Sequence, residues 1–295
     1  MNLFKYFERA FDVRRVASND AEYDQRRGYR AYHAYCRARS PLDGAPAAAD
    51  APGQRGFALL KGLLSPAVAT RLREDVTAAG EFGLLKKNAR DLHGYRVRDA
   101  EAVASLLRTV LSPHVDVPAR RFFGCHYLVH WFTVSTTPPA PQPPSISFRW
   151  HCDKGPREHL KLMVYLNDAA EHGGGTAFLD VADSAAVTAS GYLFGRAKKR
   201  TSDLAVLAAR TGRALAPIEL RPACGDAVLF QPSTIVHRGI APSRGPRYTL
   251  TVCLLPSPLP WAEALRRGTL SDLMEDELWH EDANALLRQL ESSQS

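Results

Sequence analysis

The chain has 295 residues, of which 45% are hydrophobic and 23% are charged. This composition is ordinary for a soluble globular protein and excludes a chain that is disordered throughout. The length allows a sizeable core, and all-β barrels and sandwiches commonly fill such a length as one domain. No apolar run approaches the roughly 18 residues that a membrane-spanning helix needs, so we expect none.

The charge balance is basic, with a net charge of +7 and a pI of about 9.3. Such a balance permits an acidic partner or substrate but does not require one. No basic helix, zinc knuckle or aromatic RNA-binding strand accompanies the charge, so nucleic acid is not an expected partner. Charged residues within the first nine positions interrupt the apolar stretch of a signal peptide, which predicts a cytoplasmic protein. Five widely spaced cysteines without a C-x-x-C pair predict neither a disulfide framework nor a structural zinc site.

In chain order, residues 1–40 have apolar residues at helical spacing, and an alanine- and proline-rich loop follows. A strand is predicted at 56–60. A helix then follows from Pro66, preceded by Ser65 at the N-cap, to about Ala79. Another amphipathic helix is predicted at 99–111. Beyond about residue 120, short β-rich runs typical of a sandwich or barrel lie at 121–134, 145–153, 160–167, 175–180, 215–220, 226–231, 234–238 and 247–255.

The order of these elements predicts a mainly β fold with flanking helices. We expect a helical extension and linker at 1–55 and one β-rich domain with a helical buttress at 56–259. A tail at 260–295 returns to helical spacing and is predicted to pack on the same domain.

Two histidines and one aspartate form a candidate metal site. If the run around residue 150 is a strand, alternation places Arg149, His151 and Asp153 on one face, where the imidazole and the carboxylate can ligate one ion. His237, in a second β-rich run, is the candidate third ligand. Two histidines and one carboxylate on one face of an ion are typical of non-haem iron(II) oxygenases, because the other coordination positions remain open.

Arg247 is the candidate anchor of a co-substrate. It begins a strand ten residues after His237, and the glycines and prolines between them predict a turn that returns this strand beside the incoming one. Alternation places Arg247 on one face with Thr249 and Thr251. A guanidinium on a polar inner face suits a buried dicarboxylate, which it can bind through two hydrogen bonds. A surface ion pair is the alternative.

Further residues have two interpretations each. Tyr165, on a face with Lys161 and Met163, either donates a hydrogen bond to a carboxylate of the co-substrate or packs in the core. Arg149 either meets an anionic group or forms a structural ion pair. The long stretch from 179 to 215 is predicted to be a loop that covers the substrate. Its basic residues, Lys198, Lys199 and Arg200, would contact a phosphate or carboxylate group of the substrate.

In order along the chain, several motifs resemble the phytanoyl-CoA dioxygenase-like family of iron(II)- and 2-oxoglutarate-dependent oxygenases. They are His151-Cys152-Asp153, Tyr165-Leu166-Asn167-Asp168, the glycine-rich run from Gly173 to Leu179, and Gly225-Asp226 ahead of His237. The resemblance implies a double-stranded β-helix (a jelly-roll, cupin-like core) that binds Fe(II), 2-oxoglutarate and O2, with ascorbate as an accessory reductant. At 181–184 the chain departs from the family's usual Pro-Gly-Ser-His.

The resemblance implies a dioxygenase that hydroxylates an aliphatic C–H bond and releases succinate and CO2. The predicted substrate is a small or carrier-bound metabolite with an anionic group, such as a natural-product, lipid or sugar intermediate. The alternative is a non-catalytic cupin-like module that binds a sugar, a lipid head group or a protein partner. The intact set of His151, Asp153, His237 and Arg247 favours the enzyme, since a binding module does not need all four.

Overall fold

The computed structural model describes residues 29–40, 55–79, 81–84, 93–96, 100–139, 146–153, 158–192 and 200–266. The predictions for the first 28 residues, for the loop at 41–54 and for most of the C-terminal tail lie outside these ranges. Lys198 and Lys199 lie outside them as well.

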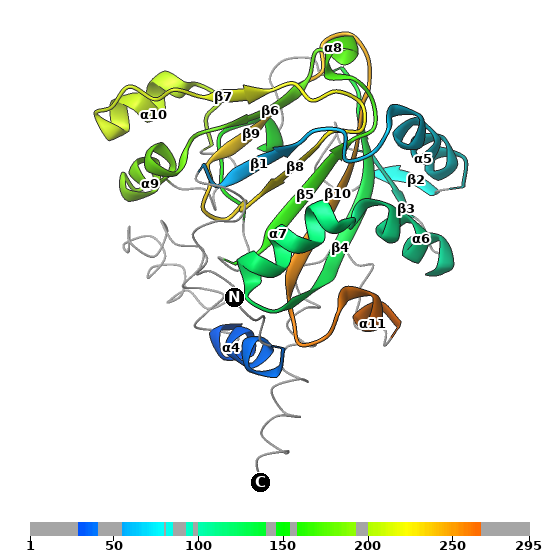
Figure 1. Cartoon of the computed structure of the whole chain (residues 1–295). Helices are drawn as coiled ribbons and strands as arrows, with labels where there is room; N and C mark the ends of the chain where they lie inside the picture. The colour runs from blue at the N-terminus through cyan, green and yellow to red at the C-terminus, as the bar shows by residue number, and fades with distance from the viewer. Residues whose placement is uncertain are drawn as a thin grey trace, which may run out of the picture.

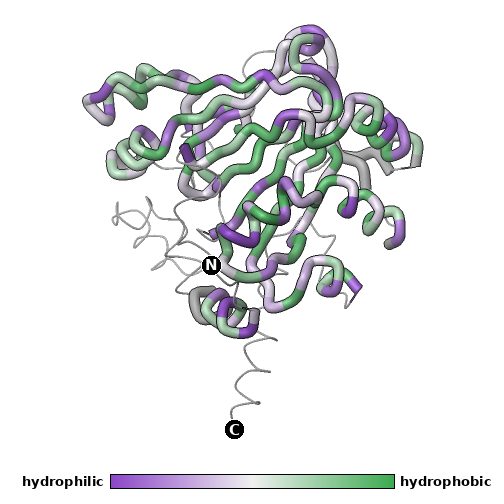
Figure 2. Tube along the Cα trace, viewed as in Figure 1, coloured by the Kyte–Doolittle hydropathy of each residue, from purple (hydrophilic) through white to green (hydrophobic). Residues whose placement is uncertain are grey.

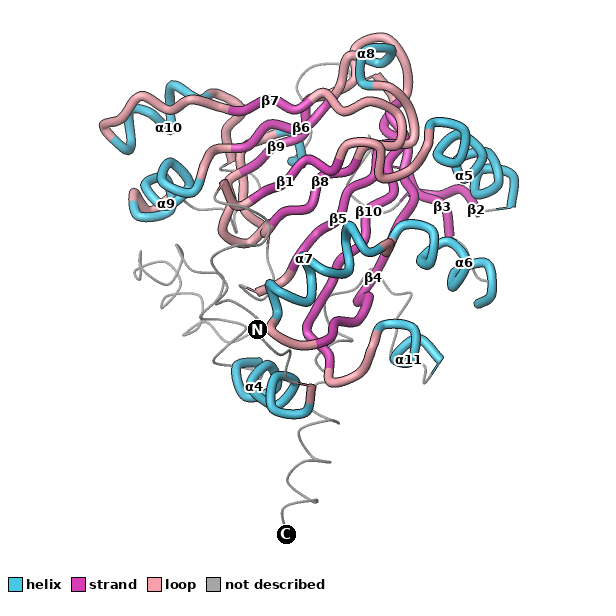
Figure 3. Tube along the Cα trace, in the orientation of Figure 1, coloured by secondary structure: helices cyan, strands magenta, loops and turns pink. Residues whose placement is uncertain are grey.

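Two antiparallel sheets form the centre of the described chain (Figures 1 and 3). The large sheet contains, in spatial order, β1 (Phe57–Leu60), β8 (Ala227–Phe230), β5 (Leu160–Tyr165), β10 (Arg247–Ser257), β4 (His126–Thr137), β3 (His93–Arg96) and β2 (Glu81–Leu84). The small sheet contains β7 (Ile218–Leu220), β6 (Gly175–Phe178) and β9 (His237–Ile240).

Helices surround these sheets (Figure 1). Those packed with the large sheet in the main core are α4 (Tyr29–Arg39), α5 (Pro66–Ala79), α6 (Ala100–Val110), α7 (Pro113–Phe123) and α11 (Trp261–Arg266). The short α8 (Ala169–His172) precedes β6, and α9 (Val181–Ala189) and α10 (Leu204–Thr211) lie beside the small sheet. None of the described helices has the length and apolar character to cross a membrane. The prediction of a mainly β fold is thus met in part, since helices make up a large share of the described chain.

Alternation along the central strands separates an apolar face from a polar one. On β10, Leu250, Val252 and Leu254 are fully buried in the main core, where each such side chain stabilises the fold by about 1.5–3 kcal/mol. Arg247 and Thr249 point to the opposite face, as the sequence predicts. Figure 2 shows the apolar character concentrated on the central strands and the polar character on the peripheral helices. On β10, the face opposite the main core is therefore the polar one.

Local signals missed in the sequence shift several boundaries. The strand predicted at 121–134 begins only at His126, because α7 occupies the preceding residues and ends at Gly124. Gly124 has a φ of 67°, and its N–H donates to the carbonyl of Arg120, which is a common way to end a helix. The strand predicted at 145–153 is instead a 3-10 turn at Ile146–Phe148 followed by a single bridge at His151. The stretch predicted as one long loop contains α9 and α10.

The strands on either side of residues 241–246 lie in different sheets, so the predicted return beside the incoming strand is wrong. β9 pairs with β6 in the small sheet, where His237 lies opposite Phe178. β10 pairs with β4 and β5 in the large sheet. Arg247, at the start of β10, reaches back to the small sheet, because its Nη1 donates to the carbonyl of Gly175 at 2.8 Å. The two sheets thus face each other at this end of the molecule.

Candidate active site

One backbone bridge brings the two candidate histidine ligands together. The N–H of His151 donates to the carbonyl of His237, and the N–H of His237 donates to the carbonyl of His151, each at 2.9 Å. The ring centroids are 4.4 Å apart. Asp153 is held two residues further along, where its N–H donates to the carbonyl of Pro232 at 2.8 Å. The segment around His151 therefore does not need to be a continuous strand. One bridge to His237 and one hydrogen bond from Asp153 bring the three side chains together.

Hydrogen bonds to backbone carbonyls fix which nitrogen of each imidazole is available. Nδ1 of His151 lies 2.6 Å from the carbonyl oxygen of Arg149, and Nδ1 of His237 lies 2.8 Å from that of Ile235. A carbonyl only accepts, so Nδ1 carries the hydrogen and Nε2 keeps its lone pair. Nε2 of His151 is 3.5 Å from Oδ1 of Asp153, and Nε2 of His237 is 3.9 Å from Oδ2.

The three side chains fit a divalent metal ion in position and in charge. One ligand atom from each residue lies within 4.8 Å of the others. Burial, together with the neighbouring His151, lowers the pKa of His237 to about 3, so the ring is neutral at physiological pH. Burial alone would raise the pKa of Asp153, but the charge of Lys161 holds it well below its usual range. Neutral imidazoles and an ionised carboxylate are the forms that bind a metal.

Lys161 belongs to this centre, and the sequence analysis gave it no role. Its ammonium contacts Oδ2 of Asp153 and lies 5.1 Å from the ring centroid of Trp131. Alternation on β5 predicts that Lys161 points to the same face as Tyr165, which the structure confirms. The sequence does not predict that Asp153 lies opposite that face and contacts Lys161.

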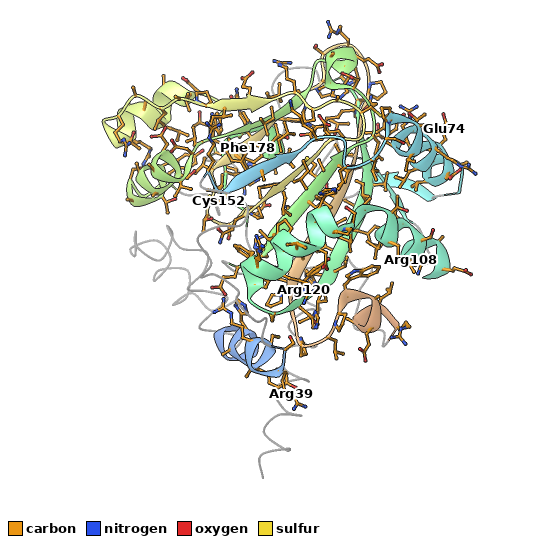
Figure 4. The ribbon with its side chains drawn as sticks, in the orientation of Figure 1. Arg39, Glu74, Arg108, Arg120, Cys152 and Phe178 are labelled. Atoms are coloured by element: carbon orange, nitrogen blue, oxygen red, sulfur yellow. The ribbon has the colours of Figure 1, made fainter. Side chains whose placement is uncertain are left out.

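The space between the sheets next to the metal ligands is lined by aromatic rings. Phe178 and Phe230 lie 6.2 Å and 5.0 Å from the ring of His237, measured between centroids. Figure 4 labels Phe178 in this region and Cys152 close by, far from the peripheral Glu74 and Arg108. Cys152 belongs to a second apolar cluster together with Trp150. The rings exclude water from one side of the site.

Arg247 is a buried cation with no carboxylate partner among the described residues. It is 7% exposed, its Nη1 donates to the carbonyls of Gly175 and Ile240, and its Nε is buried without a hydrogen-bond partner. Burial lowers the pKa of the guanidinium. A buried charge is normally paired, so this arrangement is suited to an anionic ligand. The structure thus fits the dicarboxylate expected at this position.

Phe148 covers the guanidinium and was missed in the sequence. The centroid of its ring lies 5.8 Å from Cζ of Arg247. A Cβ at Gly239 would lie 2.8 Å from Cδ1 of Phe148, so glycine at this position of β9 allows the ring to pack there. The 3-10 turn directs Phe148 toward the site, whereas strand alternation would place it on the face opposite His151.

Tyr165 is buried, and its ring packs between the sheets in a cluster with Phe178. Its hydroxyl lies 2.5 Å from Oγ1 of Thr176. The packing role is thus observed. A hydrogen bond to a co-substrate carboxylate remains a prediction.

Arg149 and Arg200 lie next to each other beside the metal ligands. Nη1 of Arg149 is 3.4 Å from the carbonyl oxygen of Arg200, and the following Thr201 accepts a hydrogen bond from the N–H of Trp150 at 2.8 Å. The hydroxyl of Tyr192 connects the two segments, accepting from the N–H of Thr201 and donating to the carbonyl of Trp150. Burial lowers the pKa of Arg200, and the charge of nearby Asp153 opposes this effect. Contact of either arginine with a substrate remains a prediction.

No family model matches the chain, and no curated protein matches it by sequence. Among solved structures, the chain is similar to the epimerase SnoN in complex with Fe3+, alpha ketoglutarate and nogalamycin RO, with 16% identity, a TM-score of 0.48, and coverage of 70% of this chain and 81% of that one. It is similar to HygX from Streptomyces hygroscopicus with nickel and 2-oxoglutarate bound, with 12% identity, a TM-score of 0.45 and coverage of 69% and 84%. It is also similar to EctD from S. alaskensis, with 15% identity, a TM-score of 0.45 and coverage of 73% and 82%.

Proposed function

We propose that the protein is an Fe(II)- and 2-oxoglutarate-dependent dioxygenase that hydroxylates an aliphatic C–H bond of a small or carrier-bound metabolite. The observation that carries the proposal is the combination of a metal-competent triad with the buried, uncompensated guanidinium of Arg247. We also propose that the two facing sheets are the halves of a double-stranded β-helix, with the metal ligands between them.

Each residue of the site has a distinct task in this proposal. Bound iron, together with 2-oxoglutarate and O2, supplies the oxidant, and succinate and CO2 are released. His151, Asp153 and His237 hold the ion through Nε2 of each ring and one carboxylate oxygen. Arg247 binds the distal carboxylate of 2-oxoglutarate, and Phe148 excludes water from the guanidinium.

The proposed substrate is anionic, such as a natural-product, lipid or sugar intermediate with a carboxylate or phosphate group. Among the described residues, Lys161 contacts Asp153, Arg200 lies close enough for the charge of Asp153 to act on it, and Arg149 is next to Arg200. After a divalent ion and the dianionic co-substrate have bound, and with Arg247 compensating one co-substrate charge, the site keeps an excess of positive charge. Such a site attracts and orients an anion.

The alternative is a cupin-like module that binds a ligand without turnover. To distinguish the two, the purified chain is loaded anaerobically with Fe(II), 2-oxoglutarate and ascorbate, exposed to O2 with a fractionated metabolite extract, and assayed for succinate. We expect substrate-dependent succinate from the wild type and none from Asp153→Ala. Asp75→Ala, which alters an exposed carboxylate on α5, is the matched control and should behave as the wild type. Full turnover by Asp153→Ala, or metal binding without turnover in any fraction, would contradict the proposal.

A further inference from the structure

His172, at the end of α8, presents a hydrogen-bond donor whose identity is fixed by its surroundings. The side chain is 1% exposed, and the N–H of Gly174 donates to Nδ1 at 2.9 Å. Burial, together with the nearby charge of Arg247, lowers the pKa of His172 to about 4, so the ring is neutral at physiological pH. A neutral ring whose Nδ1 accepts must carry its hydrogen on Nε2. This Nε2–H is buried and has no partner among the described residues.

Backbone contacts hold the His172 ring next to the place where Arg247 meets the small sheet. The N–H of Gly174 donates a hydrogen bond to the His172 ring. The next residue, Gly175, accepts a hydrogen bond from Arg247 through its carbonyl. A Cβ at Gly174 would lie 2.9 Å from Nδ1 of His172 and 3.0 Å from the carbonyl oxygen of Ile240, which also accepts from Arg247. Glycine at this position therefore lets the ring lie against the β6–β9 pair beside the guanidinium.

A third polar atom lies on the other side of Arg247. Thr137, at the end of β4, is directly opposite Arg247 in the register of β4 and β10. Its Oγ1 is buried without a hydrogen-bond partner among the described residues. Residues directly opposite in an antiparallel pair have Cβ atoms about 5 Å apart, so one ligand group can touch both side chains. We refer to Arg247, Thr137 and His172 as the Arg247 cluster.

The cluster gathers three unpaired polar atoms from three separate elements. Each such atom costs free energy in a folded protein, because it has lost water and gained no partner. A carboxylate has two oxygens with about four acceptor sites, and it can satisfy a guanidinium, a hydroxyl and an imidazole N–H together. The Nε2–H of a neutral histidine and the hydroxyl add donors without adding charge, which suits a single carboxylate beside one arginine.

We infer that His172 and Thr137 are co-substrate-positioning residues, which donate hydrogen bonds to the distal carboxylate of the 2-oxo acid that Arg247 binds. The inference rests on the proposed function, since the co-substrate is the oxo acid of that reaction. It adds two contacts that determine which oxo acid is accepted. An oxo acid without a distal carboxylate leaves all three donors unpaired.

The test compares two oxo acids that differ only at that carboxylate. Binding of 2-oxoglutarate and of 2-oxopentanoate to the anaerobic Fe(II) protein is titrated through the visible absorption of the iron–oxo-acid complex. We expect His172→Phe to raise the Kd of 2-oxoglutarate about 10- to 100-fold and to leave that of 2-oxopentanoate unchanged. His172→Gln, whose amide N–H replaces Nε2–H, should recover most of the affinity. His114→Phe, at an exposed histidine on α7, should change neither value.

The outcomes separate this inference from the proposed function. If the wild type binds neither oxo acid, both fail. If the wild type binds 2-oxoglutarate but His172→Phe weakens both oxo acids equally, or neither, the inference alone is wrong. If His172→Phe does not fold, as judged by circular dichroism, the same comparison is made with Thr137→Val, which removes only the hydroxyl. An unchanged preference for 2-oxoglutarate in that variant would overturn the inference.

Discussion

Replacing Lys161 with methionine tests whether its ammonium acts as the counter-ion of Asp153 when no metal is bound. Methionine keeps most of the apolar length and removes the charge. Removing one partner of a fully buried ion pair typically costs about 3–5 kcal/mol. The side chains of Lys161 and Asp153 are 17% and 20% exposed, so water compensates part of this loss. We therefore expect Lys161→Met to lower the free energy of unfolding of the metal-free protein by about 2–3 kcal/mol.

Metal binding should reduce this difference in stability. A divalent ion that shares the carboxylate of Asp153 takes over the role of counter-charge and is repelled by the ammonium of Lys161. At the effective dielectric of about 20 that applies near protein surfaces, even two unit charges about 5 Å apart repel by about 3 kcal/mol. Without this repulsion, Lys161→Met should bind Co(II) at least about tenfold more tightly than the wild type. Co(II) should also stabilise the variant more than the wild type.

The measurement is urea unfolding followed by circular dichroism, in EDTA and in Co(II), together with a Co(II) titration. Lys61→Met, at an exposed lysine after β1, is the matched control and should change none of these values. If Lys161→Met binds Co(II) more weakly, the ammonium serves mainly to orient the ligand carboxylate. Loss of an orienting partner typically weakens metal binding by about 10- to 100-fold, which is opposite in sign to the effect expected here.

Three further results are expected. Arg247→Met should abolish the stabilisation by 2-oxoglutarate, which in the metal-loaded wild type is about 2.7 kcal/mol at 100 times Kd; a retained shift in urea midpoint would contradict the assignment of Arg247. The folded pKa of His172, about 4, lies below its ordinary 6.5, so its contribution to stability is complete above pH 6.5 and is lost as the pH falls toward 4. Between pH 7 and 4.5 the wild type should lose about 2–3 kcal/mol more than His172→Phe in urea unfolding, and equal losses would show that the ring is not held neutral. Burial opposes protonation of His33, but hydrogen bonds to Cys125 and Glu158 raise its pKa to about 9. Glu158→Gln should lower this pKa toward 6.5 in an NMR titration, and an unchanged value would show that the pair is not formed.

The sequence predicted which side chains share a face but not which segments lie opposite each other. The faces of β5 and β10 follow from alternation alone, so the grouping of Arg247 with Thr249 and of Lys161 with Tyr165 was predicted correctly. The glycines and prolines between His237 and Arg247 show that the chain turns. They do not show which sheet receives the strand that follows, because that depends on pairing with β4 and β5, which are distant in sequence.

The residues missed at the site share the same physical cause. Lys161 and Phe148 each acquire their partner only through contact with a distant segment. Lys161 reaches Asp153 from β5 in the large sheet, and Phe148 meets Arg247 because Gly239 leaves room for its ring. The candidate metal ligands were easier to propose, since imidazoles and carboxylates indicate metal binding whatever their partners are. A lysine or a phenylalanine has many structural uses, and only its measured contacts select one of them.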